Sequence, residues 1–255
     1  MSNRFLRRAN ASVIVQKLTA KAVLERKLIC EGDRVLVAAS GGKDSSVMAW
    51  VLSVLKRALR IDYSLQALHI SSDFCACCKK SVLAARLEEW GIPFTDLSVP
   101  VIGRLKEGRK MNCYWCSTQR RTELIKYALE NGFNKIALGH HLDDIIETFF
   151  MNMTGKGTLS TMPMYLAYRK YPLSLIRPLG YLEERQIIAC AAEQNILKAA
   201  CTCPFGINSR RRDIRERIAA FTGNSGAVKR RILAALSSGR EDLLVDREGE
   251  GDETD

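Results

Sequence analysis

Residues 34–47 decide the fold, and they read RVLVAASGGKDSSV. The first six residues form an apolar run that is typical of a buried strand. Two glycines, three serines, a lysine and an aspartate follow at residues 40–46, and apolar residues at helical spacing begin at Val47. A strand, a glycine loop and a helix in this order leave backbone N–H groups and the positive end of the helix dipole at the loop. Such a loop favours an anion such as phosphate.

The same alternation continues along the chain on both sides of this loop. Apolar periodicity predicts helices at residues 12–29, 46–59, 81–90, 117–131 and 142–153, and further strands at residues 65–70, 94–99 and 135–139. Alternating strands and helices predict an α/β fold, in which helices cover both faces of a parallel sheet. Ligands of such sheets bind at the carboxyl ends of the strands.

The texture changes after about residue 154, where glycines and prolines become frequent. A helix is predicted at residues 183–194, then a cysteine loop, then basic helices at about 209–221 and 226–236. We therefore expect a small, mainly helical C-terminal appendage beside the core. The expected division is an N-terminal helical segment (1–30), a nucleotide-binding core (31–155), a C-terminal part with the distal cysteine loop and basic helices (156–240) and an acidic disordered tail (241–255).

Composition narrows the class of protein. With 47% hydrophobic and 26% charged residues, the chain reads as a soluble globular protein rather than a disordered, collagen-like or coiled-coil one. It carries 39 Lys+Arg against 28 Asp+Glu, a net charge of +11, and its last ten residues are mostly acidic. The body is therefore more basic still, which predicts a polyanionic partner, although solvated helix faces would explain the charge as well.

No apolar run reaches the roughly 18 to 20 residues of a membrane helix, and no secretory signal precedes the first helix. We expect a cytoplasmic protein with no membrane partner. Thiols stay reduced in the cytoplasm, so the nine cysteines predict metal, cluster or redox groups rather than a disulfide framework.

The glycine loop differs from the Walker loop of phosphate-transferring NTPases. That loop needs a glycine where Val37 stands, and it needs Ser or Thr after the lysine, where Asp44 stands. A second polar stretch, from Gly139 to Asp144, reads GHHLDD and lies where a strand ends and a helix begins. A carboxylate beside a phosphoryl group usually works through a metal, so Asp143 is a candidate for a magnesium or general acid–base role. An acid pair that only favours the helix dipole is the alternative.

The cysteines form several groups. Cys113 and Cys116 make a CxxC that we expect just before a helix, where Arg120 and Arg121 would stabilise thiolates. The spacing alone fits a redox dithiol, half a zinc site or part of an iron–sulfur cluster. Two further thiols, Cys201 and Cys203, follow about 85 residues later, and Cys75, Cys77 and Cys78 match no motif. Cys30 and Cys190 lie among apolar residues and are predicted to be small core residues.

The loop from Ser40 to Ser45 resembles the SGGxDS motif of the PP-loop ATP pyrophosphatases at every specified position. The resemblance implies an enzyme that adenylates its substrate and releases pyrophosphate. It implies catalytic roles for Lys43, Asp44 and Asp143, with Asp44 also holding Mg²⁺. The implied ATP-binding residues are Ser40, Gly41, Gly42, Lys43, Asp44, Ser45, His69 at a strand end that offers backbone to adenine, Gly139 and His140.

The loop, the CxxC, a distal cysteine and the GHHxDD stretch together resemble the tRNA 2-thiocytidine synthetase family. The resemblance runs from about residue 12 to about 236 and implies a [4Fe–4S] cluster held by Cys113, Cys116 and Cys203, with Cys201 as an alternative third ligand. It implies that ATP activates the C2 oxygen of cytidine 32 in the anticodon loop of tRNA, and that sulfur replaces this oxygen.

The family resemblance also implies partners. These are tRNA, a sulfur donor such as a cysteine desulfurase or sulfide, and a second copy in a homodimer. The candidate contacts to the tRNA backbone lie on the basic C-terminal helices and are Arg210, Arg211, Arg212, Arg215, Arg217, Lys229, Arg230 and Arg231.

Three other functions stay open at this point. Lysidine synthetases share the loop but need no cysteine cluster, so the CxxC argues against them. Enzymes that make 2-thiouridine carry three cluster cysteines together with paired zinc-finger cysteines at both ends, which this chain lacks. A non-catalytic iron–sulfur protein that binds nucleotides would release no pyrophosphate in the presence of tRNA.

Overall fold

A computed structural model describes residues 10–74, 80–196 and 209–237 of the chain, and for residues 209–211 it describes the backbone alone. Its centre is a six-stranded sheet in the order β3-β2-β1-β4-β6-β5. All neighbouring strands are parallel except β5, which runs antiparallel to β6. The strands are β1 (Arg34–Ala38), β2 (Ser64–Ser72), β3 (Phe94–Val99), β4 (Lys135–Ala137), β5 (Tyr165–Ala167) and β6 (Ser174–Ile176).

Eight helices accompany this sheet in the described residues, and the strands and helices alternate through most of the core. The α/β fold with a parallel sheet predicted from the sequence is confirmed. The helices are α1 (Ala11–Glu25), α2 (Lys43–Ala58), α3 (Lys80–Glu89), α4 (Cys113–Glu130), α5 (Leu142–Lys156), α6 (Glu184–Glu193), α7 (Ser209–Thr222) and α8 (Gly226–Ser237).

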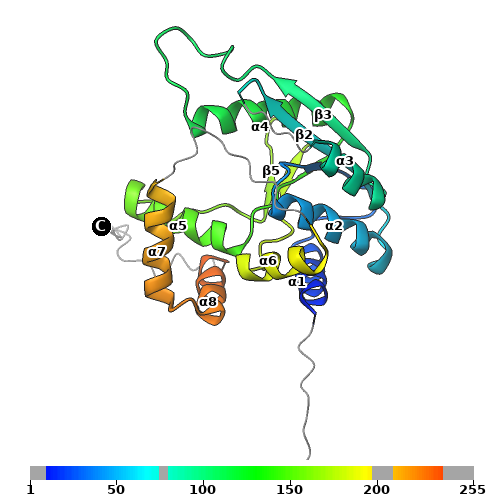
Figure 1. The fold of residues 1–255 in the computed structure, drawn as a ribbon. Coiled ribbons are helices and arrows are strands. Elements are labelled where there is room, and N and C mark those ends of the chain that lie inside the picture. The colour runs from blue at the N-terminus through cyan, green and yellow to red at the C-terminus, as the bar shows by residue number, and fades with distance from the viewer. Residues whose placement is uncertain (1–9, 75–79, 197–208, 238–255) are drawn as a thin grey trace, which may run out of the picture.

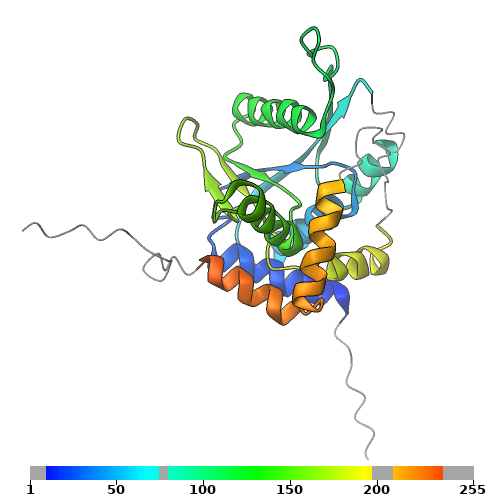
Figure 2. The same ribbon diagram turned by 90° about the vertical axis from the view of Figure 1, so that its left-hand side faces the viewer.

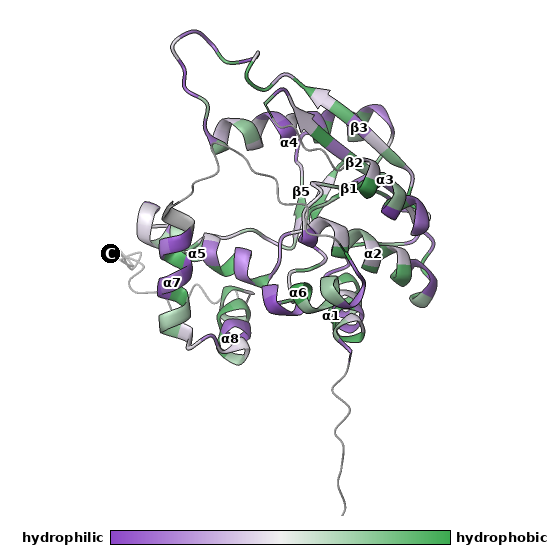
Figure 3. Ribbon diagram, viewed as in Figure 1, coloured by the Kyte–Doolittle hydropathy of each residue, from purple (hydrophilic) through white to green (hydrophobic). Residues whose placement is uncertain are grey.

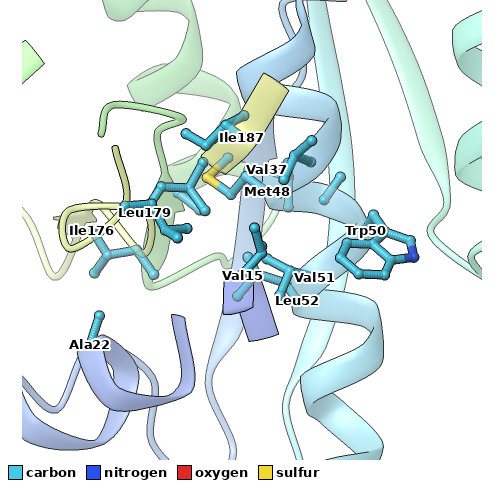
Figure 4. Packing of buried hydrophobic residues seen from close by; sticks show 14 of the residues in the cluster. Val15, Ala22, Val37, Met48, Trp50, Val51, Leu52, Ile176, Leu179 and Ile187 are labelled. Atoms are coloured by element: carbon cyan, nitrogen blue, oxygen red, sulfur yellow. The ribbon is translucent and has the colours of Figure 1, made fainter. Parts of the chain in front are cut away.

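Strand β1 is apolar along its length because both of its faces are buried. Val35 and Val37 belong to a large core with α1, α2 and α6, which Figure 4 shows around Met48. Leu36 points to the opposite face and joins a smaller core with α4. Side chains alternate between the two faces of a strand, so a continuous apolar run is the pattern that a doubly covered strand requires. Figure 1 shows α4 on one side of the sheet and α1, α2 and α6 on the other.

The direction of the chain reverses at β1, and this reversal positions the site. From β1 the chain proceeds outward to β2 and β3, and it then returns to place β4 on the other side of β1. The loops that leave β1 and β4 therefore diverge at their carboxyl ends. Ligands of open parallel sheets bind at such a switch point. The two loops are the glycine loop before α2 and the GHHLDD stretch before α5.

The C-terminal helices pack on this same side of the molecule. Both α7 and α8 contact α5 (Figure 2), and Arg26, the residue after α1, donates a hydrogen bond to Ser237 Oγ at the end of α8 at 3.3 Å. Ile218 of α7 and Leu233 of α8 are buried in the large core. The appendage is thus attached to the helix that begins at the GHHLDD stretch.

The structure differs from the sequence prediction in three places. Strands β5 and β6 extend the sheet with residues that the sequence assigned to the C-terminal part. The CxxC opens helix α4 instead of preceding it, because Asn112 caps the helix: its side chain accepts a hydrogen bond from the backbone N–H of Trp115. Cys30 is exposed, so its prediction as a core residue is wrong, whereas Cys190 is fully buried.

Four groups of predictions lie outside the described residues: the cysteines at 75–78, Cys201, Cys203 and the tail from residue 241. No helix among the described residues is long and apolar enough to cross a membrane.

Candidate nucleotide and sulfur site

The glycine loop is held in shape by its own serines. Ser45 Oγ donates a hydrogen bond to the carbonyl of Gly42 at 3.0 Å, so the 3.0 Å contact between Ser40 and Ser45 is made by the Ser40 hydroxyl proton. Gly41 has φ +79°, in the left-handed region where a side chain is strained. Gly42 then forms the N-cap of α2. The loop therefore presents the first turn of α2 at the end of β1, as the sequence predicts for a phosphate site.

Lys43 lies between two carboxylates. Its ammonium group contacts Glu184 Oε1 at 2.9 Å and Asp44 Oδ2 at 3.2 Å. Burial acts to lower the pKa of Lys43, but the hydrogen bond to Glu184 and the charge of Asp44 outweigh it and raise the pKa above its usual value. The lysine of the loop is therefore charged, and Glu184 of α6 holds its ammonium group.

Asp44 has one oxygen in the Lys43 contact and one without a partner. Its Oδ1 is buried and makes no hydrogen bond within the described part of the chain. A buried carboxylate oxygen without a partner is costly unless a ligand satisfies it. Carboxylate oxygen is also the donor that Mg²⁺ prefers. Asp44 thus fits the magnesium role that the sequence assigned to it.

Gly139 brings the second stretch into contact with the loop. A Cβ atom at this position would lie 3.0 Å from the backbone nitrogen of Ser45 and 3.1 Å from the carbonyl carbon of Asp44. Only glycine allows the end of β4 to approach the first turn of α2 this closely. The GHHLDD stretch and the SGGKDS loop are therefore parts of one site.

The two acids of this stretch, Asp143 and Asp144, make different contacts. Asp144 Oδ2 accepts the backbone N–H of His141 at 3.1 Å and so caps α5. Asp143 Oδ2 accepts the backbone N–H of Glu184 at 2.7 Å, and Asp143 Oδ1 contacts Lys229 Nζ at 2.5 Å. Burial acts to raise the pKa of Asp143, but the hydrogen bond from Lys229 and that from the Glu184 backbone outweigh it, so the pKa lies below its usual value. Both oxygens of Asp143 are engaged, unlike those of Asp44.

His140 is oriented by a buried arginine. Arg177, at the carboxyl end of β6, donates from Nε to His140 Nδ1 at 3.3 Å and from Nη1 to the carbonyl of Pro163 at 2.5 Å. A neutral His140 that accepts at Nδ1 carries its proton on Nε2. Burial, reinforced by the charge of Arg121, lowers the pKa of Arg177 to about 10. No ion pair with a carboxylate is found for Arg177 among the residues described, so positive charge accumulates beside His140.

His69 lies at the carboxyl end of β2 and is buried. Its Nδ1 lies 2.7 Å from the carbonyl oxygen of Ala39, the residue before the glycine loop, so Nδ1 carries a proton. Burial lowers the pKa of His69, which favours the neutral ring. Its Nε2 is then an acceptor, and it has no hydrogen-bond partner within the described ranges. His69 thus borders the loop through its side chain, whereas the sequence assigned it a backbone role.

The two described cysteines of the predicted cluster lie in the first turn of α4. Cys113 is exposed and Cys116 is partly buried against the smaller core. Residues three apart lie on the same face of a helix, so both thiols share one side of this turn. The helix N-terminus favours thiolates there. Arg120, one turn further on, is close enough to His69 to affect its pKa. This links α4 to the nucleotide side of the site.

The cations predicted to bind tRNA fall into two groups. Arg215 pairs with Glu147 at 2.7 Å, Lys229 pairs with Asp143 as described, and Arg230 lies 3.4 Å from Glu183. These three are held by acids of α5 and α6 or of the turn before α6. Arg212, Arg217 and Arg231 are exposed, and none has an ion pair in the part of the chain that the structure describes. The side chains of residues 210 and 211 are outside that part.

Two residues of the site were missed by sequence reasoning as functional groups. Glu184 looks like an ordinary acid in the first turn of a helix, and nothing in the sequence ties it to Lys43. Arg177 carried a stronger signal, because a charged residue directly follows the apolar strand β6. A pocket of about 460 Å³, lined among others by Arg26, Ile145 and Leu233, contains none of the predicted site residues.

The fold and the geometry of the site together define the general class of the protein. A parallel sheet with a serine–glycine phosphate loop at its switch point defines a nucleotide-binding α/β protein, and residues 12–220 match the family model of the PP-loop domain. The U34-tRNA thiolase NcsA of Methanococcus maripaludis, solved with its [4Fe-4S] cluster, superposes with a TM-score of 0.75. It is 23% identical, and the match covers 89% of this chain and 78% of that one. The same fold is therefore present in both.

Curated relatives identify the family more narrowly. A tRNA-cytidine(32) 2-sulfurtransferase of Geobacter metallireducens is 36% identical over 233 residues, which cover 89% of this chain and 90% of the relative. The enzyme of the same name from Geobacter sulfurreducens is 34% identical over 92% of this chain and 93% of its own length. The chain belongs to the tRNA-cytidine(32) 2-sulfurtransferase family of PP-loop proteins.

Proposed function

We propose that the protein thiolates cytidine 32 of tRNA at the expense of ATP, giving 2-thiocytidine, AMP and pyrophosphate. The observation that carries this proposal is the contact between Gly139 and the first turn of α2, which joins the two nucleotide-site stretches. Helix α4, which carries the CxxC, contacts β2 and β4 of the same sheet. The family membership supports the choice of reaction. A lysidine-type ligase would leave the CxxC without a role.

In the first step, the C2 oxygen of the cytidine attacks the α-phosphorus of ATP, and pyrophosphate leaves. The loop amides and the Lys43 ammonium group hold the departing phosphates and offset their growing negative charge. To do so, the Lys43 ammonium group must leave the Glu184 carboxylate and bind phosphate. The backbone N–H of Glu184 can still donate its hydrogen bond to Asp143. Asp44, whose Oδ1 has no partner in the described residues, would hold Mg²⁺, and the ion would supply charge neutralisation at the phosphates.

In the second step, a sulfur nucleophile attacks C2, and AMP leaves with the former carbonyl oxygen. Adenylation turns a poor leaving group into a good one and so divides a difficult substitution into two easier steps. We propose Cys113, Cys116 and Cys203 as ligands of a [4Fe–4S] cluster, which would supply an open iron site for this sulfur. We also propose that His140 contributes to nucleotide binding, which the hydrogen bond from Arg177 to its Nδ1 supports.

The partners and the location complete the proposal. The phosphate backbone of tRNA would contact the exposed arginines of α7 and α8, and the sulfur would come from a cysteine desulfurase or from sulfide. We further propose a cytoplasmic enzyme that acts as a homodimer.

Pyrophosphate release tests the proposal. Anaerobically purified protein with ATP and Mg²⁺ should release pyrophosphate only when tRNA containing cytidine 32 is added, and tRNA with uridine at that position should give none. Release without tRNA, or equal release with both tRNAs, would contradict the proposed substrate. No release across a panel of tRNAs would favour a nucleotide-binding iron–sulfur protein without turnover.

A further inference from the structure

The segment between β3 and α4 is a second basic region. It spans residues 100–112 and projects from the body of the molecule in Figures 1 and 2, and Figure 3 shows hydrophilic residues along it. Its four cations are all exposed, and Glu107 is its one acid. The cations are Arg104, Lys106, Arg109 and Lys110.

Three of these four cations have no ion pair within the described residues. Arg104 pairs with Glu123 of α4 at 2.6 Å, which fixes the base of the segment. For Lys106, Arg109 and Lys110, no ion pair exists within residues 10–74, 80–196 and 209–237. By contrast, Arg215 and Lys229 of the C-terminal helices are bound to acids. The exposed cations of this segment can therefore attract an anion from outside the chain.

Tyr114 follows this basic segment in the sequence, in the first turn of α4. Its side chain is 82% exposed, more than any other large hydrophobic residue that the structure describes. It stands between Cys113 and Cys116 in the first turn of α4. The neighbouring Trp115 donates from Nε1 to the carbonyl of Val101 at 3.0 Å and packs against the smaller core, which anchors this turn to the projecting segment. An aromatic ring is thus presented to solvent on a fixed helix turn.

An exposed aromatic ring that follows a basic segment in the chain has the two features that bind single-stranded RNA. Unpaired bases stack on aromatic rings, and neighbouring phosphates contact basic side chains. A duplex offers phosphates but no free base faces, so the ring favours a loop over a stem. Its position between the two cysteines would hold an RNA loop where the sulfur must be delivered.

We propose that Tyr114, Lys106, Arg109 and Lys110 form the binding surface for the anticodon loop of the substrate, with the Tyr114 ring stacked on an unpaired base. This inference rests on the proposed function, and it names the part of the chain that recognises the single-stranded region. The exposed arginines of α7 and α8 are left to contact the phosphates of the stem.

Fluorescence anisotropy with a labelled anticodon stem-loop, and with a fully paired duplex of equal length, tests this surface. Under anaerobic conditions Tyr114→Ala should weaken stem-loop binding roughly 10-fold and leave duplex binding unchanged, whereas Tyr114→Phe should bind within about 2-fold of wild type. The matched control is Tyr171→Ala in the connection between β5 and β6, where Tyr171 is 43% exposed. This change should not alter stem-loop binding. Equal stem-loop binding by wild type and Tyr114→Ala would overturn the stacking role.

A second variant keeps the inference testable if Tyr114→Ala disturbs the cysteines, which iron content will reveal. The triple change of Lys106, Arg109 and Lys110 to alanine lies outside the CxxC, and it should weaken stem-loop binding and lower the salt slope by roughly 2 to 3 units. An unchanged affinity and slope would overturn the surface. Failure of the wild-type protein to bind any tRNA stem-loop would instead refute the proposed function.

Discussion

The nucleotide end and the cysteine end of the site are built differently. At the nucleotide end, serines hold the loop, Lys43 lies between Asp44 and Glu184, and Asp143 is bound by Lys229. At the cysteine end, Cys113 is exposed and Tyr114 is 82% exposed. At the nucleotide end, the charged groups are paired with opposite charges of the same chain. At the cysteine end, side chains are exposed to solvent. The nucleotide end is therefore preorganised by contacts within the chain, whereas the cysteine end presents Cys113 and Tyr114 to solvent.

The largest expected effect separates the two ends. Cys113→Ser should remove one cluster ligand and abolish 2-thiocytidine formation, while pyrophosphate release and ATP affinity stay close to wild type. In the described residues, the side-chain hydrogen bonds of the loop are made within the loop and with α6, not with α4. Iron analysis and mass spectrometry of digested tRNA measure the two outcomes. Cys30→Ser, at an exposed cysteine away from the site, is the control and should retain both. Retained thiolation by Cys113→Ser would refute the cluster assignment.

A change in the glycine loop should have the opposite effect, with adenylation lost and the cluster kept. Asp44→Ala removes the carboxylate whose Oδ1 has no partner, and pyrophosphate release should fall at least about 100-fold while iron content is unchanged. The control is Asp62→Ala, at a side chain 82% exposed in a surface pair with Lys56. Normal pyrophosphate release by Asp44→Ala would show that the loop does not hold magnesium through this residue.

A single methyl group should loosen the preorganised end. In Gly139→Ala, the new Cβ would meet backbone atoms of Ser45 and Asp44 at 3.0 to 3.1 Å, which cannot move without displacing the loop. We expect KM for ATP to rise about 10-fold and unfolding free energy to fall by about 1 to 3 kcal/mol. Gly155→Ala is the matched control, because nothing lies within 4 Å of its Cβ and it lies in helix α5. It should leave KM unchanged and preserve or slightly increase stability.

The smallest expected effect concerns pH. The pKa of Asp143 is lower in the folded state than its ordinary value of 3.8, so its ionised pair with Lys229 stabilises the fold above pH 3.8. This contribution disappears as the pH falls through the lowered pKa. The difference in unfolding free energy between wild type and Asp143→Asn should therefore be about 2 kcal/mol at pH 7 and shrink below about pH 4. Urea titrations measure it, and a difference that does not change with pH would contradict the pairing.

The core was predictable because its signals are local. Apolar periodicity placed β1 to β4 and the helices between them, since a strand buried on both faces and an amphipathic helix each impose a period on the sequence. The strands β5 and β6 were missed because each is short and lies after residue 154, where prolines and glycines interrupt the pattern, whereas the equally short β4 lies in the apolar run at residues 135–139. The start of α4 was missed because Asn112 was not read as a cap, although asparagine is a strong N-cap residue.

The candidate site divides in the same way. The loop residues Ser40 to Ser45 were predictable because one continuous stretch supplies them. The partners of Lys43 and Asp143 were not, because Glu184 and Lys229 come from α6 and α8, which only the packing of the C-terminal helices brings to the loop. For the same reason, sequence alone could not separate the basic residues that pair internally, such as Arg215, from those that stay available.

The most direct test is the identity of the modified nucleoside. Anaerobically purified protein with its iron and sulfide measured would be incubated with ATP, Mg²⁺, sulfide and tRNA lacking the modification, and the digested tRNA would be analysed by mass spectrometry. The expected result is 2-thiocytidine at position 32, formed only when ATP is present and matched by released AMP. The appearance of 2-thiouridine, or of thiolated cytidine without ATP, would contradict the proposed reaction.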